Sequence, residues 1–172
     1  MTGKANTTTS TGAYSISTSE PAVGTCQYRT TYAGNDTYGN AASNVVTVTI
    51  VQGTQLSLSG VQIHVTSSSP PAKVTVTYAF SGTFATTQPN PADIANAKIY
   101  LQWSKDNKNW SPVSPTPAVT NANGAYAFKG TLNPGTYYFR TAYNGSSSYA
   151  ASFSRVVKVS VSSTGSSVVS YV

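Results

Sequence analysis

The chain of 172 residues carries little charge, with ten Lys and Arg against four Asp and Glu, and it has one His and one Cys. So few titratable groups leave acid–base and metal chemistry almost without candidates, because both need several carboxylates, imidazoles or thiolates. A single Cys excludes an internal disulfide. No apolar run reaches the length of about 20 residues that a membrane helix needs, so we expect no membrane insertion.

The residues that are abundant point to strands. The sequence holds 25 Ser and 25 Thr together with 12 Tyr, and 39% of its residues are hydrophobic. The chain has enough apolar residues to form a core, which excludes a disordered chain of the highly charged kind. It has few strong helix formers, which excludes a helical bundle. The mixture of β-branched, aromatic and turn residues predicts an all-β protein. The net charge of +6 is spread singly along the chain, so we expect no nucleic-acid partner.

An internal repeat organises the sequence. Residues 25–50 align without a gap on residues 136–161 at an offset of 111, with 10 of 26 positions identical. Residues 12–25 also match 124–136, with one residue inserted. The second copy opens near Thr54, so the first would open about 57 residues ahead of Met1. We therefore predict a partial module over 1–53 with only its last three strands, a complete module over 54–162, and a Ser/Gly-rich tail over 163–172.

Alternating apolar and polar residues mark the strands of the complete module. Residues 73–80 place Val74, Val76, Tyr78 and Phe80 on one face, and residues 97–104 place Ile99, Leu101 and Trp103 on one face. Further strands are predicted over 55–65, 125–130, 136–143 and 154–161, with an extended loop over 81–96. About seven strands with frequent turns predict an antiparallel β-sandwich of two sheets.

The second copy resembles the Ig-like (Big-type) repeats of bacterial and archaeal cell-surface proteins. The similarity lies in AKIYLQWSKDNKNW, then NGAY, then GTYYFRTAYNG and a closing VVKVSV strand, and it covers most of 54–161 and the tail half of a module at 12–51. The chain differs in having Asn107 where the repeats usually have Gly. The resemblance implies an Ig-like sandwich, an extracellular location at the cell surface, and neighbouring Ig-like modules or copies of the chain as partners.

Catalytic candidates are weak. His64 stands alone in its strand, and Cys26 occupies an inward position that Tyr137 fills in the second copy, so we predict a strand residue and a buried, inert thiol. The four acids, Glu20, Asp36, Asp93 and Asp106, lie in different turns with no spacing that suggests a catalytic pair. Asp106 with Asn107 predicts a turn rather than a calcium site. We expect no enzyme, metal or cofactor.

Three other sets of residues are candidates for binding or modification. Tyr100, Trp110 and Tyr138 are the aromatic residues that best suit sugar stacking on an exposed face. Four N-x-[ST] sequons, at Asn6, Asn35, Asn109 and Asn144, are compatible with glycosylation. The end of the chain offers a donor strand in Val168, Val169, Tyr171 and Val172 for pairing with 12–51 or with another copy.

These observations favour a non-enzymatic structural or adhesive module of a prokaryotic surface protein. One alternative is the subunit of an extracellular filament joined by strand complementation, because three strands alone leave unpaired edges. The other is a carbohydrate-binding module, with cell-surface glycans as partners.

Overall fold

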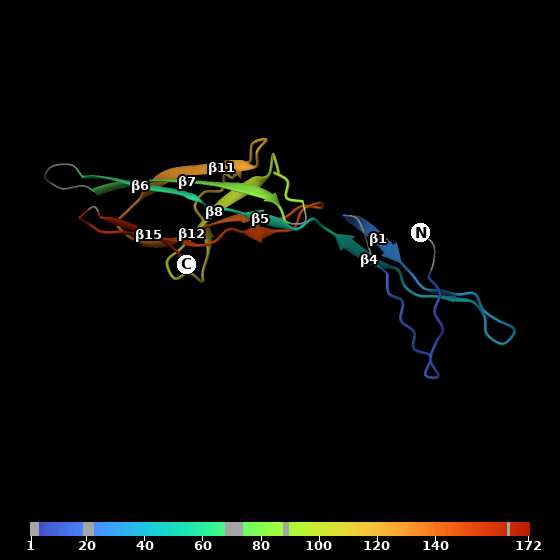
Figure 1. The fold of residues 1–172 in the computed structure, drawn as a ribbon. Coiled ribbons are helices and arrows are strands. Elements are labelled where there is room, and N and C mark those ends of the chain that lie inside the picture. The colour runs from blue at the N-terminus through green and yellow to red at the C-terminus, as the bar shows by residue number, and fades with distance from the viewer. Residues whose placement is uncertain (1–3, 19–22, 68–73, 88–89, 165) are drawn as a thin grey trace. The chain divides into compact units, whose positions relative to one another are not determined.

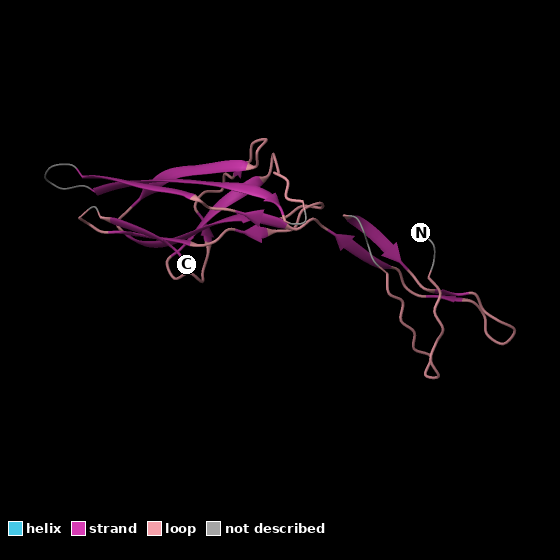
Figure 2. Ribbon diagram, viewed as in Figure 1, coloured by secondary structure: helices cyan, strands magenta, loops and turns pink. Residues whose placement is uncertain are grey.

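The computed structural model describes residues 4–18, 23–67, 74–87, 90–164 and 166–172. These residues form strands and loops only, with no helix among them (Figure 2). The chain divides into two compact units, Met1–Ile50 and Val51–Val172. The prediction of an all-β chain is confirmed.

The second unit contains two antiparallel sheets (Figure 1). In the smaller sheet the long strand β7 is central, with β11 on one side and β5 and β6 paired to successive parts of it. The bounds are β5 Thr54–Leu56, β6 Gly60–Ser67, β7 Val74–Thr86 and β11 Ala125–Leu132. The single strand predicted over 55–65 is divided between β5 and β6 by a break over 57–59, immediately before Gly60, which begins β6.

The larger sheet has the order β10-β8-β12-β14-β15, with β9 paired to β8 and β13 paired to β12. The bounds are β8 Lys98–Ser104, β9 Ser111–Pro112, β10 Ala118–Val119, β12 Gly135–Tyr143, β13 Ser152–Phe153, β14 Val157–Val161 and β15 Ser167–Tyr171. The central strand β12 pairs with β8 along one edge and with β14 along the other. It is therefore the strand that holds this sheet together.

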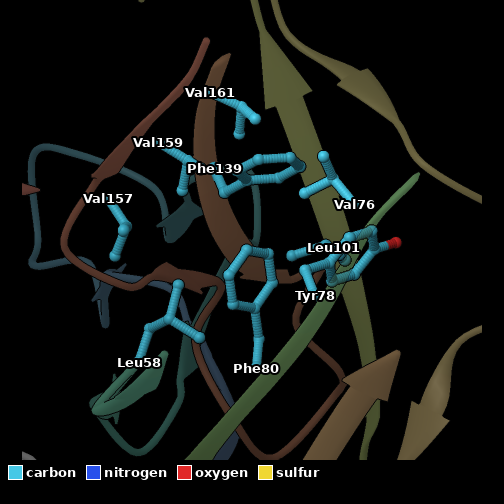
Figure 3. Close-up of a cluster of buried hydrophobic side chains, with 9 residues drawn as sticks. All are labelled: Leu58, Val76, Tyr78, Phe80, Leu101, Phe139, Val157, Val159 and Val161. Atoms are coloured by element: carbon cyan, nitrogen blue, oxygen red, sulfur yellow. The ribbon is translucent and has the colours of Figure 1, made fainter. Parts of the chain in front are cut away.

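The two sheets pack face to face as a β-sandwich over a shared core (Figure 3). Val76, Tyr78 and Phe80 project from β7, and Phe139 projects from β12 to meet them. The ring centroids of Phe80 and Phe139 are 4.9 Å apart. The larger sheet also contributes buried residues from its other strands: Leu101, Val157, Val159 and Val161. The alternation in the sequence arises because successive side chains point to opposite faces of a strand.

The core continues in a second buried cluster that includes Phe84. It contains Leu56, Phe84, Ile94, Ala97, Ile99, Tyr126 and Tyr143. Two tyrosines in the core lie directly opposite glycines of the neighbouring strand, Tyr126 opposite Gly82 and Tyr78 opposite Gly130. A Cβ atom at either glycine would collide with the facing tyrosine. The glycines therefore leave the space into which the rings pack.

The first unit has four short strands, β1 Gly24–Tyr28, β2 Thr31–Tyr32, β3 Ala41–Ala42 and β4 Val46–Ile50. They form two antiparallel pairs, β1 with β4 and β2 with β3. None of the residues described in this unit is buried. Strand pairs of this size leave most of their apolar surface in water.

The register of the first unit reproduces that of the second. Cys26 pairs with Val48 as Tyr137 pairs with Val159, and Tyr32 pairs with Ala41 as Tyr143 pairs with Ser152. The loops agree as well, because Gly34 and Gly145 have φ values of 88° and 87°. The hydroxyl of Tyr14 lies 2.7 Å from Thr30 Oγ1, and that of Tyr126 lies 2.8 Å from Thr141 Oγ1. The repeat in the sequence is thus a repeat in the fold.

Three expectations need correction or adjustment. The loop predicted over 81–96 is wrong in its first part, because β7 continues to Thr86 and pairs there with β5. Residues 13–18, which align with β11, form no strand. The reason is that β11 pairs with β7, and the described part of the first unit offers no equivalent of β7. The division between units falls at Ile50 and Val51, and the tail over 163–172 contributes β15 to the larger sheet.

Candidate functional site

The outward face of the larger sheet in the second unit carries a group of aromatic and cationic side chains. Ile99 and Leu101 of β8 are buried in the core, so Tyr100 and Gln102, which alternate with them along the strand, face outward. On β12, Tyr138 and Arg140 alternate with the buried Phe139 and Thr141 and face the same way. Register places Gln102 opposite Arg140 and Tyr100 opposite Ala142. We call this set the aromatic face: Tyr100, Gln102, Trp110, Tyr138, Arg140, Phe153 and Lys158.

Arg140 is the centre of the aromatic face. Its guanidinium carbon lies 4.2 Å from the ring centroid of Trp110 and 4.1 Å from that of Phe153. Arg140 Nε donates a hydrogen bond of 2.8 Å to Gln102 Oε1. Desolvation by these neighbours lowers the pKa of the guanidinium from its ordinary value, and it remains a cation at neutral pH. Stacking on two rings and one side-chain bond fix its orientation.

The three predicted sugar-stacking residues do share this face, but they are not equally available. Tyr100 and Tyr138 are half-buried, and the Nζ of Lys158 lies 5.8 Å from the Tyr138 ring centroid. Trp110 is also half-buried, and one side of its ring is covered by Arg140. A sugar stacks on an open ring face, so Tyr100 and Tyr138 suit stacking better than Trp110.

Phe153 is a member of the aromatic face that the sequence analysis did not single out. It is 55% exposed, and β13 places it opposite Ala142. The first copy has Ala42 at the aligned position. This difference between the two copies is the signal by which the sequence could have identified Phe153, because burial in the core does not explain a large aromatic side chain at an exposed position.

Arg140 supplies a prediction about this face. Arg140→Met keeps an unbranched side chain of similar length and removes the charge, so both cation–π contacts and the bond to Gln102 are lost. We expect the free energy of unfolding of the second unit to fall by about 1 kcal/mol. Urea titration followed by circular dichroism measures it. Lys129→Met, on an exposed position of the smaller sheet, is the control and should change stability by less than about 0.5 kcal/mol.

The turn after β8 is built around Asp106. Its carboxylate accepts hydrogen bonds from the backbone N–H groups of Asn109 and Lys108 and from the hydroxyl of Ser104. These bonds, that of Asn109 first, hold the pKa of the Asp106 carboxyl well below its usual range. Asn107 has a φ of 58°, a left-handed conformation that Asn adopts more readily than most residues. The carboxylate therefore stabilises the turn.

The four sequons lie in exposed loop segments, but the hydrogen bonds of their amides differ. Asn109 Nδ2 donates to Asp106 Oδ2 at 2.6 Å, and Asn6 Nδ2 donates to the carbonyl of Ser15. Asn35 Oδ1 accepts bonds from the N–H groups of Thr37 and Tyr38, which fixes the turn between β2 and β3. Asn144 is exposed in the aligned turn of the second unit. Glycosylation replaces an amide hydrogen, so Asn109 and Asn6 would each lose part of their donor capacity, whereas the acceptor oxygen of Asn35 would be kept.

Groups of the kind that carry catalysis are scattered. His64 is exposed on β6, and Cys26 is half-buried on β1 rather than buried as predicted. Asp36 and Asp106 occupy separate turns, Asp93 forms an isolated β-bridge with Ala85, and Glu20 lies outside the described residues. Within the described ranges there is no group of three or more His, Cys, Asp or Glu that could hold a metal ion.

Comparisons with family models, with curated proteins and with solved structures found no match to this chain. The resemblance to Ig-like repeats of surface proteins therefore stays a prediction. Among the described residues there is no helix of the length and apolar character that crossing a membrane requires.

Proposed function

We propose that this chain is a non-enzymatic Ig-like structural module of a prokaryotic cell-surface protein, whose work is to space and display what is attached to it. The observation that carries the proposal is the register shared by the two units, since a sandwich pattern written twice in tandem is typical of modular arrays. The abundance of Ser and Thr supports it further, because hydroxyls at outward positions hydrate the sheets without charge.

The start of the second unit is suited to bear load. Gln52 N donates to the carbonyl of Ser148 at 2.8 Å, and Ala150 N donates to the carbonyl of Gln52 at 2.8 Å. Thr54 Oγ1 adds a bond of 2.8 Å to the carbonyl of Ala150. Together they form a parallel clamp between the entry to the unit and the loop after β12. Tension applied at Val51 acts first on these bonds.

Force spectroscopy tests the proposal. Pulled through its two ends, the second unit should unfold in one cooperative step that releases about 400 Å of chain, since its 122 residues each span about 3.4 Å when extended. Gradual extension with no such step would contradict a load-bearing role.

Thr54→Val removes the hydroxyl from the clamp and keeps the shape of the side chain. We expect a lower unfolding force and a loss of about 1 kcal/mol in the free energy of unfolding, the usual worth of one hydrogen bond. Thr136→Val, which removes an exposed hydroxyl that lies 3.1 Å from Ser160 Oγ, is the matched control and should leave the unfolding force unchanged. If both variants lower the unfolding force equally, the hydrogen bond of Thr54 does not resist the applied force.

A carbohydrate-binding role is the second candidate, favoured by the aromatic face. It predicts saturable retention on a glycan array that Tyr138→Ala or Tyr100→Ala abolishes. The spacer role predicts no retention of either the parent chain or the variants.

A filament is the third candidate, favoured by β15. This strand is at the edge of the larger sheet, all five of its residues are exposed, and it pairs with β14 of its own unit. Donation of β15 to another copy predicts concentration-dependent polymers that disappear when the chain is truncated after Ser163. Unchanged assembly after truncation would exclude the donor strand of Val168, Val169, Tyr171 and Val172.

A further inference from the structure

The first unit exposes the side chains that form the core of the second. Val46 is 60% exposed and Val48 is 39% exposed, whereas the aligned Val157 and Val159 are both 0% exposed. Tyr32 is 45% exposed, and the aligned Tyr143 is 8% exposed. We call the surface formed by Cys26, Tyr28, Val46, Val48 and Ile50 on β1 and β4 the open face. Its backbone is already arranged as in a finished sandwich, while its valines remain exposed to solvent.

The second unit shows what covers such a face. Val76, Tyr78, Phe80 and Leu101 pack on Phe139 and on the valines of β14. Leu56, Phe84, Ile94 and Ile99 likewise pack with Tyr143 and Tyr126. Leu101 and Ile99 flank the face from β8 of the same sheet, and all the residues that cover or flank it lie between positions 54 and 120, in the part of the module that precedes the repeat. An apolar face of this kind is stabilised by removal from water, at roughly 25 cal/mol per Å² buried.

The open face differs from its counterpart at two central positions. Cys26 stands where the second unit has Tyr137, and Tyr28 stands where it has Phe139. The hydroxyl of Tyr28 is buried and has no hydrogen-bond partner among the described residues. A buried unpaired hydroxyl costs about 1–3 kcal/mol, and because this oxygen is already out of contact with solvent, the cost falls on the first unit with or without a cover. A fitting cover would place a larger side chain over the smaller Cys26.

We propose that the open face is a docking surface for a β-sheet half-module with the strand pattern of residues 54–119, carrying added bulk opposite Cys26. The occupant is a polypeptide segment and not a second copy of the first unit. A second copy offers only the same open face, whose residues other than Tyr28 are Cys, Val and Ile, whereas aromatic rings of β7 fill this space in the second unit. The proposal rests on the Ig-like organisation proposed above, but not on its mechanical role.

The experiment extends the full chain with its own half-module. A copy of residues 54–115 is joined ahead of Lys4. Lys4 is the right junction because the alignment that places Gly12 on Gly124 also places Lys4 on Thr116. The probe is the alkylation rate of Cys26 by iodoacetamide, because Cys26 is the only thiol in the chain and lies within the open face. We expect the extension to slow alkylation at least about tenfold, since reaction then requires local opening.

Two matched variants make the result specific. An extension that carries Val76→Asp and Leu101→Asp in the added copy has the same length, but its charged side chains cannot be buried against the open face. Cys26 should then be alkylated as fast as in the unextended chain. Tyr28→Phe restores the residue type of the second unit and is tested with the intact extension, in case the unpaired hydroxyl prevents closure. Unchanged alkylation in both the parent and the Tyr28→Phe extended chains would overturn the proposal.

Two other results are informative. If Cys26 of the unextended chain is protected at high concentration and becomes reactive on dilution, a second copy is the occupant and the proposal is wrong. The unfolding force of the second unit is read independently. A loss of that force with Cys26 still protected would reject the mechanical role alone, and an unprotected Cys26 with that force intact would reject the docking surface alone.

Discussion

Replacing Phe139 by Ala is expected to lower the free energy of unfolding of the second unit by about 3–5 kcal/mol, the range for removing a buried phenylalanine. The side chain is 1% exposed and lies between the two sheets. Its ring centroid is 4.9 Å from that of Phe80 and 5.8 Å from that of Tyr78. Truncation therefore opens a cavity at the point where the sandwich is held together.

Urea unfolding followed by circular dichroism measures this loss. Val168→Ala is the control, because Val168 is 66% exposed on the edge strand β15, and it should change stability by less than about 0.5 kcal/mol. If both variants have similar midpoints, the two sheets are not packed through Phe139.

The second unit is expected to lose about 2–3 kcal/mol of stability between pH 10 and pH 12 through Tyr126. Burial raises the pKa of Tyr126 to about 12 from its ordinary value of 10.0. The folded state therefore keeps the phenolic proton where the unfolded state has lost it. The stability that this group contributes is complete below pH 10 and is lost as the pH rises towards 12, at about 1.36 kcal/mol for each pH unit.

Tyr126→Phe separates this effect from general alkaline unfolding. The variant gives up the bonds to the carbonyl of Ser57 and to Thr141 Oγ1, so it should be about 1–3 kcal/mol less stable at pH 7. The stability of this variant should fall less steeply above pH 10. Some slope should remain because burial also raises the pKa of Tyr78. Tyr14→Phe alters the aligned residue, which is 52% exposed, and should follow the parent curve. If the stability of the parent and of Tyr126→Phe falls equally steeply above pH 10, then Tyr126 is not held in its neutral form by burial.

Much of the fold could be predicted because its signals are local. Alternation identified the inward faces of β7 and β8, and the repeat predicted that 25–50 and 136–161 fold alike, which the matching registers confirm. The role of Gly82 could not be predicted. In the sequence it resembles the start of a loop, whereas in the structure it lies opposite Tyr126 inside β7. Only the pairing of distant strands distinguishes these two roles.

The aromatic face was predicted in part. Tyr100, Trp110 and Tyr138 were proposed to share an exposed face, but the stacking of Arg140 on Trp110 and on Phe153 depends on the register of β8, β12 and β13. Spacing along the chain carries no information about that register. The missing strand over 13–18 has a similar origin, because strand formation there depends on a partner and not on the residues of the segment alone.

Amide hydrogen exchange, resolved by residue with NMR, tests most directly the claim that one sandwich pattern occurs twice and is covered only once. Amides that bond within the β1–β4 pair have counterparts in the same register within the β12–β14 pair, so the comparison uses only these amides. We predict that the β12 and β14 amides exchange at least about 100-fold more slowly, because opening them requires disruption of the core. Equal protection at the aligned positions would contradict the account.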